Sequence, residues 1–204
     1  MNILVLSPHI DDGVIGCGGM MTKYQERGAS ITYLVLTNDS PPYPHDILNK
    51  ELNDALIALG LNSKDIIYRN FPTRYFYKHR DEVLDSLFLL SNEQEYDYIL
   101  TPSRFDVHQD HQVITEELLR IYKRRQVSIL GYEIILNQYR FSTSFFCGLE
   151  ETHIQRKITA FNCFKSQLIR PHYSSELFTS LANVRGAQMG VKYAEAFEAI
   201  RVII

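Results

Sequence analysis

Short apolar runs alternate along this chain with longer segments of helical periodicity, and this alternation constrains the fold more than any other feature. Each run is shorter than a buried helix, and the run from Ile3 to Leu6 ends near the turn former Pro8. Such runs predict strands at residues 3–6, 31–36, 65–68, 98–100 and 127–130. Helical spacing predicts helices at residues 14–27, 46–59, 75–90, 113–122 and 150–165. Together they indicate an α/β fold, with a mainly parallel sheet and helices on both of its faces.

The size of the chain fits one domain. Its 204 residues, 45% of them apolar and 12% aromatic, are enough to bury one substantial core, so we expect a single domain over residues 1–204. No internal repeat is visible. Residues 130–146 mix aromatic and β-branched residues with polar insertions, and their topology stays open.

Charge and cysteine content exclude several classes of protein. The net charge is −3, and the charged residues form no basic stripe, so nucleic acid is not an expected partner. Cys17, Cys147 and Cys163 lack CxxC spacing, which fits reduced thiols in the cytosol. The first residues have no cationic segment, and no stretch approaches the ~20 apolar residues of a membrane span. We therefore expect a soluble, cytoplasmic protein.

Charged side chains follow the first predicted strand directly, in the sequence His9-Ile10-Asp11-Asp12-Gly13. Ligands bind parallel sheets beyond the carboxyl ends of the strands, so this position alone makes the motif a candidate site. The alternative is that Asp11 and Asp12 only cap the helix that follows.

A second polar cluster, His108-Gln109-Asp110-His111, follows the fourth predicted strand. If the strand order is 3-2-1-4, the first and fourth strands are neighbours and the two clusters converge. The alternative for this cluster is a polar loop in which Asp110 caps the next helix and the histidines lie on the surface.

Convergence of these residues would supply the ligands of a hydrolytic zinc site. Such sites use three protein ligands from histidine and carboxylate, and His9, Asp12 and His111 form such a set. Zinc polarises a carbonyl oxygen and lowers the pKa of its water to roughly 7. Asp11 is then the candidate general base, and His108, held by Asp110, is the candidate to stabilise the oxyanion or to protonate the leaving amine.

The two motifs together resemble those of the LmbE-like (PIG-L) family of zinc-dependent N-deacetylases. The resemblance continues in residues 16–19, 55–60, 165–167, 185–186, 190 and 193–197. It implies a Rossmann-like fold, zinc on His9, Asp12 and His111, a general base at Asp11 and a transition-state-stabilising histidine at His108. The implied substrates are N-acetylglucosamine-type sugars on small molecules, lipids or glycans. Short relatives often form oligomers, so a homo-oligomer stays open.

The departures from the family pattern lie outside the ligand set. Ile10 and Gln109 replace common prolines, and Gly13 replaces an acidic residue, which should leave the metal chemistry intact. Many relatives carry a substrate-gripping arginine three residues before Glu51, where this chain has Leu48. The standard sugar-conjugate substrates are therefore in question.

Further site residues are predicted from loops near the two motifs. Residues 37–45 are dense in turn formers, which favours a substrate-facing loop. Tyr43 and His45 are candidate substrate contacts in this loop, where tyrosine and proline can stack on a sugar ring. Asp39 contacts hydroxyls or only forms a turn. Arg104 is expected to line the site, and Asp106 to orient a ligand histidine. The remaining histidines, His79, His153 and His172, are expected at ordinary surface or loop positions.

We therefore expect a zinc-dependent N-deacetylase of an N-acetylated amino sugar or glycoconjugate precursor. A zinc hydrolase of formyl, carbamoyl or larger acyl amides stays open as an alternative, and a non-catalytic metal- or glycan-binding protein is less favoured. The segment from Gly16 to Gly19 lacks the Gly-x-Gly-x-x-Gly spacing of dinucleotide sites, so its glycines are expected to allow close packing of helix on sheet.

Overall fold

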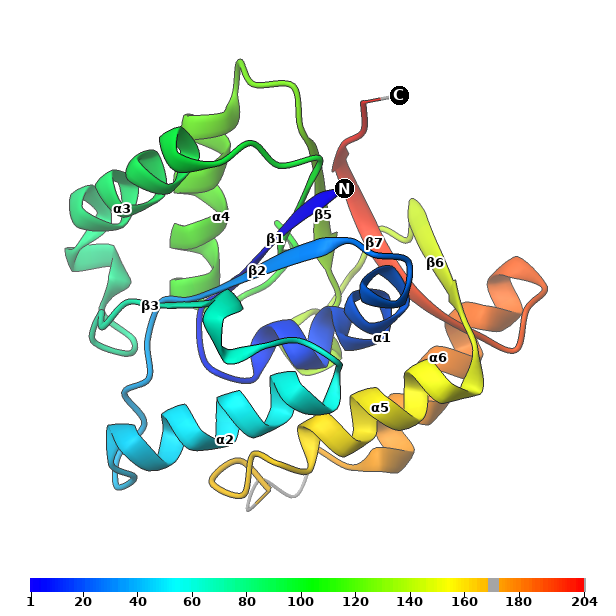
Figure 1. Cartoon of the computed structure of the whole chain (residues 1–204). Coiled ribbons are helices and arrows are strands. Elements are labelled where there is room, and N and C mark those ends of the chain that lie inside the picture. Colours follow the sequence, from blue (N-terminus) through cyan, green and yellow to red (C-terminus); the bar gives the residue numbers. More distant parts are fainter. Residues whose placement is uncertain (169–172, 204) are drawn as a thin grey trace.

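A seven-stranded sheet in the order β3-β2-β1-β4-β5-β7-β6 forms the centre of the molecule (Figure 1). The structure is a computed structural model that describes residues 1–168 and 173–203. The strands are β1 (Asn2–Ser7), β2 (Ser30–Val35), β3 (Ile66–Tyr68), β4 (Tyr98–Pro102), β5 (Ser128–Tyr132), β6 (Phe145–Leu149) and β7 (Tyr193–Arg201). The first five pair in parallel, and β7 runs antiparallel to both β5 and β6. The first four strands have the common order 3-2-1-4, which is the condition under which the two polar motifs were expected to converge.

Helices cover both faces of this sheet, as predicted. They are α1 (Asp12–Glu26), α2 (His45–Ala58), α3 (Arg80–Glu93), α4 (Gln109–Tyr122), α5 (Glu151–Phe161) and α6 (Ser175–Met189), with short 3₁₀ turns η1 (Ser63–Asp65), η2 (Phe76–Lys78) and η3 (Ile135–Asn137). One face carries α3 and α4, and the other carries α1, α2, α5 and α6 (Figure 1). No helix in residues 1–168 and 173–203 is long and apolar enough to cross a membrane.

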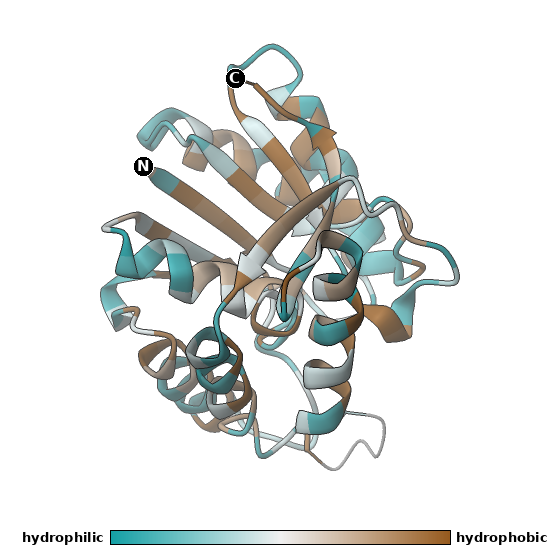
Figure 2. Cartoon of the chain, turned by 90° about the vertical axis from the view of Figure 1, so that its right-hand side faces the viewer, coloured by the Kyte–Doolittle hydropathy of each residue, from teal (hydrophilic) through white to brown (hydrophobic). Residues whose placement is uncertain are grey.

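The central strand β1 contributes to two apolar cores at once. Ile3 and Val5 pack into the core beneath α1, while Leu4 and Leu6 pack into the core beneath α3 and α4. Side chains alternate between the faces of a sheet, so a strand covered on both sides is apolar throughout. The strands in Figure 2 are accordingly mostly brown, whereas the helices show both teal and brown along their length.

Glycines let α1 lie close to the sheet. A Cβ atom added at Gly16 would lie 2.2 Å from the ring of Tyr132, and one at Gly13 would lie 2.7 Å from the ring of Tyr33. The structure thus matches the packing role expected of Gly16, and Gly13 has a similar role that the sequence analysis did not assign to it. This close packing also holds the first turn of α1 against the end of β1, where the first polar motif lies.

A break in α1 is stabilised by a buried carboxylate. The backbone departs from helical geometry at Cys17 (φ −144°, ψ 21°). Beyond the break, the N–H groups of Gly19 and Met20 donate to the Glu195 carboxylate at 2.9 and 2.7 Å. Lys157 donates to the same carboxylate at 2.7 Å, so the charge of Glu195 has a buried partner.

The helix boundaries differ from the sequence prediction mainly at the polar motifs. α1 begins at Asp12 and α4 at Gln109, inside the motifs rather than after them. The predicted helix over residues 75–90 is divided into η2 and α3, and the helix predicted to reach residue 165 ends at Phe161. The open segment 130–146 contains η3 and the start of β6, while α6 and β7 were not predicted.

Candidate functional site

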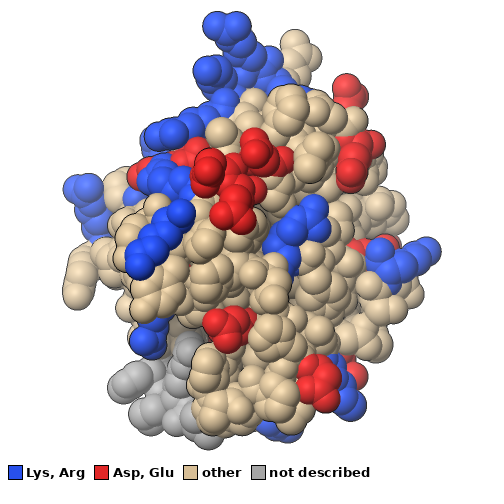
Figure 3. Space-filling model, turned by 90° about the vertical axis from the view of Figure 1, so that its left-hand side faces the viewer, with Lys and Arg blue, Asp and Glu red and all other residues tan. Residues whose placement is uncertain are grey.

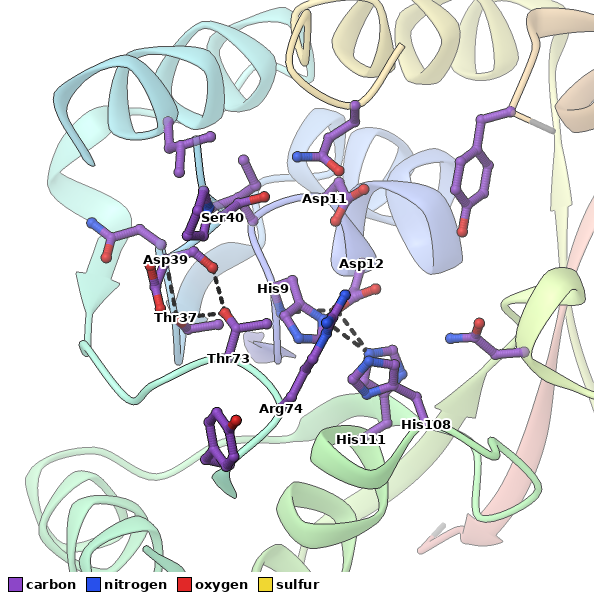
Figure 4. A pocket seen from close by; sticks show the side chains of 18 residues that line it. His9, Asp11, Asp12, Thr37, Asp39, Ser40, Thr73, Arg74, His108 and His111 are labelled. Atoms are coloured by element: carbon purple, nitrogen blue, oxygen red, sulfur yellow. Dashed lines mark hydrogen bonds and ion pairs between the residues drawn. The ribbon is translucent and has the colours of Figure 1, made fainter. Parts of the chain in front are cut away.

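The two polar motifs open on one cavity at the carboxyl ends of the strands. This cavity has a volume of about 520 Å³, and Figure 4 shows the side chains around it. Its lining comes mainly from the segments that follow β1, β2, β3, β4 and β5, with further residues from α2 and from the chain beyond α5. The lining residues are His9, Ile10, Asp11, Asp12, Thr37, Asn38, Asp39, Ser40, Pro41, Leu48, Thr73, Arg74, Tyr75, His108, His111, Asn137, Gln167 and Tyr173.

Three side-chain atoms converge at the base of the cavity. His9 Nδ1 lies 2.9 Å from Asp12 Oδ2, His111 Nε2 lies 3.1 Å from the same oxygen, and the two nitrogens are 3.2 Å apart. The segments that carry them are about a hundred residues apart in sequence, and pairing of β1 with β4 brings them together. The structure thus joins the two predicted motifs in one cluster.

Carboxylates hold the other nitrogen of both imidazoles. His111 Nδ1 lies 2.8 Å from Asp106 Oδ2, and His9 Nε2 lies 3.2 Å from Asp110 Oδ2. Both nitrogens of each ring face a carboxylate, so both carry protons in the metal-free protein, and the nitrogen that faces Asp12 would have to lose its proton to bind a metal ion. Asp106 and Asp110 would then hold the N–H on the other side of each ring and fix its orientation. Asp106 therefore lies where the sequence analysis expected an orienting carboxylate.

His108 is bound differently from the other two histidines. It is the N-cap of α4, and its Nδ1 accepts a hydrogen bond from the backbone N–H of Asp110 at 3.2 Å. Its Nε2 is then the nitrogen that carries a proton. Ligand atoms of His9, His108 and His111 all lie within 4.8 Å of one another, so these three histidines could hold a metal ion. The hydrogen bond at Nδ1 favours Asp12 over His108 as the third ligand.

Asp110 has a different partner from the one expected. The sequence analysis assigned it to hold His108, but its carboxylate faces His9 and accepts from the backbone N–H groups of Arg74 and Phe76 at 2.7 and 3.3 Å. Only its backbone N–H reaches His108. Asp110 therefore positions His9 and the segment that carries Arg74.

The charges of the cluster strongly perturb its ionisable groups in the metal-free protein. Burial lowers the pKa of His9, but Asp12 and the hydrogen bonds to Asp110 and Asp12 outweigh this effect and raise it to about 9. Burial is likewise outweighed at His111, where Asp12 and Asp106 raise the pKa to about 10. At His108, burial and the charges of His111 and His9 lower the pKa to about 4. Strong shifts concentrated in one cavity are typical of functional sites.

Neither aspartate of the first motif caps α1 through its side chain. Asp11 occupies the N-cap position but makes no side-chain capping hydrogen bond. It is buried in the wall of the cavity beside Asp12 (Figure 4). Asp12 instead accepts the backbone N–H of His9 at 2.8 Å, which closes the turn between them. The structure therefore does not support the alternative in which Asp11 and Asp12 only cap α1.

The structure brings only Asp39 of the predicted substrate-binding residues to the cavity. Tyr43 packs against the core beneath α1, and His45 is exposed as the first residue of α2. Arg104 points elsewhere, because its Nε donates to Glu198 at 2.6 Å. Glu198 lies on β7, which the sequence analysis did not predict.

Several cavity residues had no role in the sequence analysis. Thr37, Asn38, Thr73, Arg74, Asn137, Gln167 and Tyr173 line the cavity without having been predicted as site residues. Thr37 and Asn38 lie in the loop over residues 37–45 that was expected to face the substrate, and Gln167 lies in a segment that carries the family resemblance, so these three had a signal. His79 pairs with Glu82 and is not in the cavity lining, whereas His172 lies outside the described residues. The surface position expected of His153 is wrong, because its ring is buried in α5, where it faces Glu26.

Comparison with known proteins identifies the family. Residues 4–122, more than half of the chain, match the model of PIG-L, GlcNAc-PI de-N-acetylase. The chain belongs to the PIG-L family. It is therefore a member of a deacetylase family, whose enzymes are hydrolases acting on carbon–nitrogen amide bonds.

Relatives of this PIG-L protein cover most of its length. It is 25% identical over 170 residues to the uncharacterized deacetylase YaiS of Escherichia coli (strain K12), and the match covers 80% of this chain and 90% of YaiS. The solved structure of the conserved protein TT1542 from Thermus thermophilus has a TM-score of 0.79 at 23% identity, covering 99% of this chain and 95% of TT1542.

Two more distant structures share the fold. The zinc-inhibited form of teicoplanin deacetylase Orf2 has a TM-score of 0.79 at 15% identity, covering 98% of this chain and 100% of Orf2. GalB, a 4-carboxy-2-hydroxymuconate hydratase from Pseudomonas putida KT2440, has a TM-score of 0.78 at 18% identity, with coverages of 100% and 97%. Since a hydratase has the same fold, the fold alone does not specify deacetylation.

Proposed function

We propose that this PIG-L protein is a cytoplasmic, zinc-dependent N-deacetylase acting on an N-acetylated amino sugar or a glycoconjugate precursor. Residues 1–204 would act as one catalytic domain. The observation that carries the proposal is the convergence of His9 Nδ1, Asp12 Oδ2 and His111 Nε2 within 2.9 to 3.2 Å. These are the three ligands that we assign to zinc.

The donor set fits a tetrahedral zinc ion. Ligand atoms at the usual bond lengths of ~2.0–2.1 Å around tetrahedral zinc lie about 3.3 Å apart. The three distances in the cluster are close to this value. Two imidazole nitrogens held together against one buried carboxylate oxygen also favour a cation between them. Asp106 and Asp110 orient the rings as carboxylates do behind zinc-bound histidines.

The chain supplies the remaining catalytic groups from the cavity wall. Zinc, when bound, would polarise the acyl carbonyl and make a water molecule more acidic. Asp11, next to Asp12 in the wall, accepts the proton of the attacking water. His108 presents its Nε2–H as a hydrogen-bond donor for the oxyanion of the tetrahedral intermediate. Asp11 and His108 are the two candidates to return a proton to the leaving amine.

The cavity suits a polar substrate of the size of a sugar. Its volume of about 520 Å³ is within the usual range of small-molecule sites. Amide and hydroxyl side chains also line the wall, and they can exchange hydrogen bonds with sugar hydroxyls. They are Thr37, Asn38, Ser40, Thr73, Asn137 and Gln167. The family description, GlcNAc-PI de-N-acetylase, supports the same class of substrate.

The first test is release of free amine from N-acetylated and N-formylated amino sugars by zinc-loaded protein. Asp11→Asn should abolish turnover while zinc content, measured by mass spectrometry, stays at one ion per chain. Asp46→Asn is the matched control, since Asp46 is exposed in the first turn of α2. Zinc should be titrated from below one equivalent upward, because a zinc-inhibited form of teicoplanin deacetylase Orf2 exists.

The outcomes separate the alternatives. Amine release by the wild type and not by Asp11→Asn supports deacetylation, and preference for the formyl substrates would assign a different acyl group. Equal activity of wild type and Asp11→Asn would refute the role of Asp11. Zinc binding without amine release from any substrate would favour a binding protein.

A further inference from the structure

Arg74 has a backbone conformation that arginine rarely adopts. Its φ is +73°, and it is the only non-glycine residue with positive φ among residues 1–168 and 173–203. A side chain in this left-handed region costs free energy that glycine would avoid. Such strain persists only where surrounding contacts fix the backbone, and it concentrates at functional sites.

The contact that fixes Arg74 comes from the catalytic cluster itself. Its backbone N–H donates to Asp110 Oδ2 at 2.7 Å, and the N–H of Phe76 donates to Asp110 Oδ1 at 3.3 Å. Asp110 is fully buried, and the same Oδ2 lies 3.2 Å from His9 Nε2. One carboxylate thus sets the position of Arg74 relative to His9.

The guanidinium of Arg74 is available to a ligand. The side chain is exposed and points from its loop into the cavity (Figure 4). The Arg74 side chain makes none of the hydrogen bonds or ion pairs found among the described residues. Arg104, in contrast, is held by Glu198. Arg74 is also the one lysine or arginine among the described residues that line this cavity.

An arginine placed in this way recognises an oxyanion. A guanidinium offers a planar fork of N–H donors that matches the geometry of carboxylate and phosphate groups. Among the described lining residues outside the histidine cluster, the other charged side chains are Asp11, Asp12 and Asp39, which would repel an anion. Leu48 of α2 also lines the cavity, and it is apolar and supplies no charge. Of the described residues that line the cavity, Arg74 is therefore the one outside the metal cluster that can neutralise an anionic group of a substrate.

We propose that Arg74 is a specificity-determining residue that binds a carboxylate or phosphate group of the substrate. This inference rests on the proposed deacetylase function and narrows its substrates to N-acylated amino sugars that carry an anionic group. His108 and the zinc ligands act at the acyl carbon, while Arg74 holds the anionic group of the same substrate. The binding of zinc and the cleavage of the amide do not require Arg74.

The test compares three substrates that share one sugar. They are N-acetylglucosamine, N-acetylmuramic acid with a carboxylate, and N-acetylglucosamine 6-phosphate, each assayed by amine release with zinc-loaded protein. We expect one anionic substrate to exceed the neutral one in kcat/KM by at least tenfold, and the preferred substrate tells carboxylate from phosphate. Arg74→Gly, which suits a positive φ, should raise KM for that substrate at least tenfold with kcat within twofold.

Control variants separate recognition from a general effect. Arg74→Lys keeps the charge without the planar fork and should recover only part of the preference. Arg124→Gly removes an exposed arginine from the turn after α4 and should change nothing. The proposal is overturned if Arg74→Gly lowers kcat/KM equally for all three substrates, or if the wild type shows no preference for either anionic substrate.

A binding measurement keeps this inference separate from the proposed function. If none of the three substrates releases amine, the affinity of zinc-loaded wild type and Arg74→Gly for inorganic phosphate is measured by calorimetry. An affinity at least tenfold weaker in Arg74→Gly would uphold anion recognition while the deacetylase proposal fails. Equal affinities would overturn the role of Arg74 as well.

Discussion

Hydrogen bonds to single side chains decide which atoms of the cluster can bind a metal. Asp106 occupies Nδ1 of His111, and Asp110 occupies Nε2 of His9, so the two remaining nitrogens meet at Asp12. His108 has the opposite arrangement, because a backbone N–H occupies its Nδ1. Three histidines in one cavity therefore divide into two candidate ligands and one donor.

The zinc affinity of the protein tests the role of Asp106. Replacing a carboxylate behind a zinc-bound histidine typically lowers affinity roughly 10–100-fold. We expect Asp106→Asn to show a loss of this size, because the amide keeps the shape but not the charge that faces His111 Nδ1. Competition with a fluorescent chelator measures the zinc affinity. Asp85→Asn, at an exposed position of α3, is the control, and an unchanged affinity for Asp106→Asn would contradict the ligand assignment.

The thiols give a prediction that depends on pH. Burial raises the pKa of Cys17 far above its usual range and that of Cys147 to about 12, whereas Cys163 is partly exposed and its pKa is raised less. Thiolate is the reactive form, so a raised pKa slows labelling and a higher pH speeds it. At a pH of about 8, Ellman's reagent should label only Cys163 in the native protein. The labelling of Cys163 should be faster at a pH of about 9.5. The native Cys163→Ser variant should not be labelled. Rapid labelling of a second thiol would contradict the buried positions.

Sequence reasoning located the clustered residues but not the rest of the cavity wall. His9, Asp12 and His111 could be placed together because they follow neighbouring strands, and strand order was inferable from the alternation of elements. The direction of Arg104 was not inferable, because it depends on Glu198 of β7. Arg74 gave no signal, since its conformation is imposed by Asp110, 36 residues away.

Among the elements, α1 connects the candidate site to strand β7 and helix α5. Its first turn carries the aspartates, and its break at Cys17 is held by Glu195 of β7 and by Lys157 of α5. The glycines of residues 16–19 made it possible to predict a helix packed closely on the sheet. The break at Cys17 was not predictable, because it depends on Glu195, which is distant in sequence. The starts of α1 and α4 were predicted too late for a related reason, since polar residues at a helix start interrupt the apolar periodicity.

Denaturation measures the contribution of the ion pair that holds α1. The side chains of Lys157 and Glu195 are only 7% and 6% exposed. Removing one partner of a buried pair typically costs roughly 3–5 kcal/mol, because the other charge stays buried. We expect Glu195→Gln to lower the free energy of unfolding by such an amount, measured with urea. Glu151→Gln, in the exposed pair with Lys192, should have a much smaller effect, and equal losses would refute this account.

At the scale of the whole molecule, the cluster connects segments of the chain that are far apart in sequence. His9 and Asp12 follow β1, whereas His111 lies on α4 on the opposite face of the sheet from α1. A cation bound between them would hold both layers of helices to the central strands. On the face in Figure 3, Lys and Arg side chains gather at the top and upper left, next to a group of Asp and Glu side chains.

Thermal stability should therefore depend on zinc. A ligand present at roughly 1,000 times its Kd stabilises the native state by about 4 kcal/mol, which for a chain of this size raises Tm by on the order of 10 °C. We expect this rise in Tm when zinc is added to the metal-free protein, and calorimetry measures it. His111→Ala should lose it, and His79→Ala, which alters a histidine paired with Glu82 outside the cavity, should keep it. A full rise in His111→Ala would contradict the ligand set.

The position of β7 also bears on how the chain is synthesised. β6 joins the sheet through β7, and β7 follows the other six strands of this sheet in the sequence, so it leaves the ribosome after them. Until then β5 has a free edge, α1 lacks the carboxylate at its break, and Arg104 lacks its partner. A nascent chain that already contains both polar motifs therefore still has an unfinished sheet, and we expect it to depend on chaperones until residues 193–201 emerge.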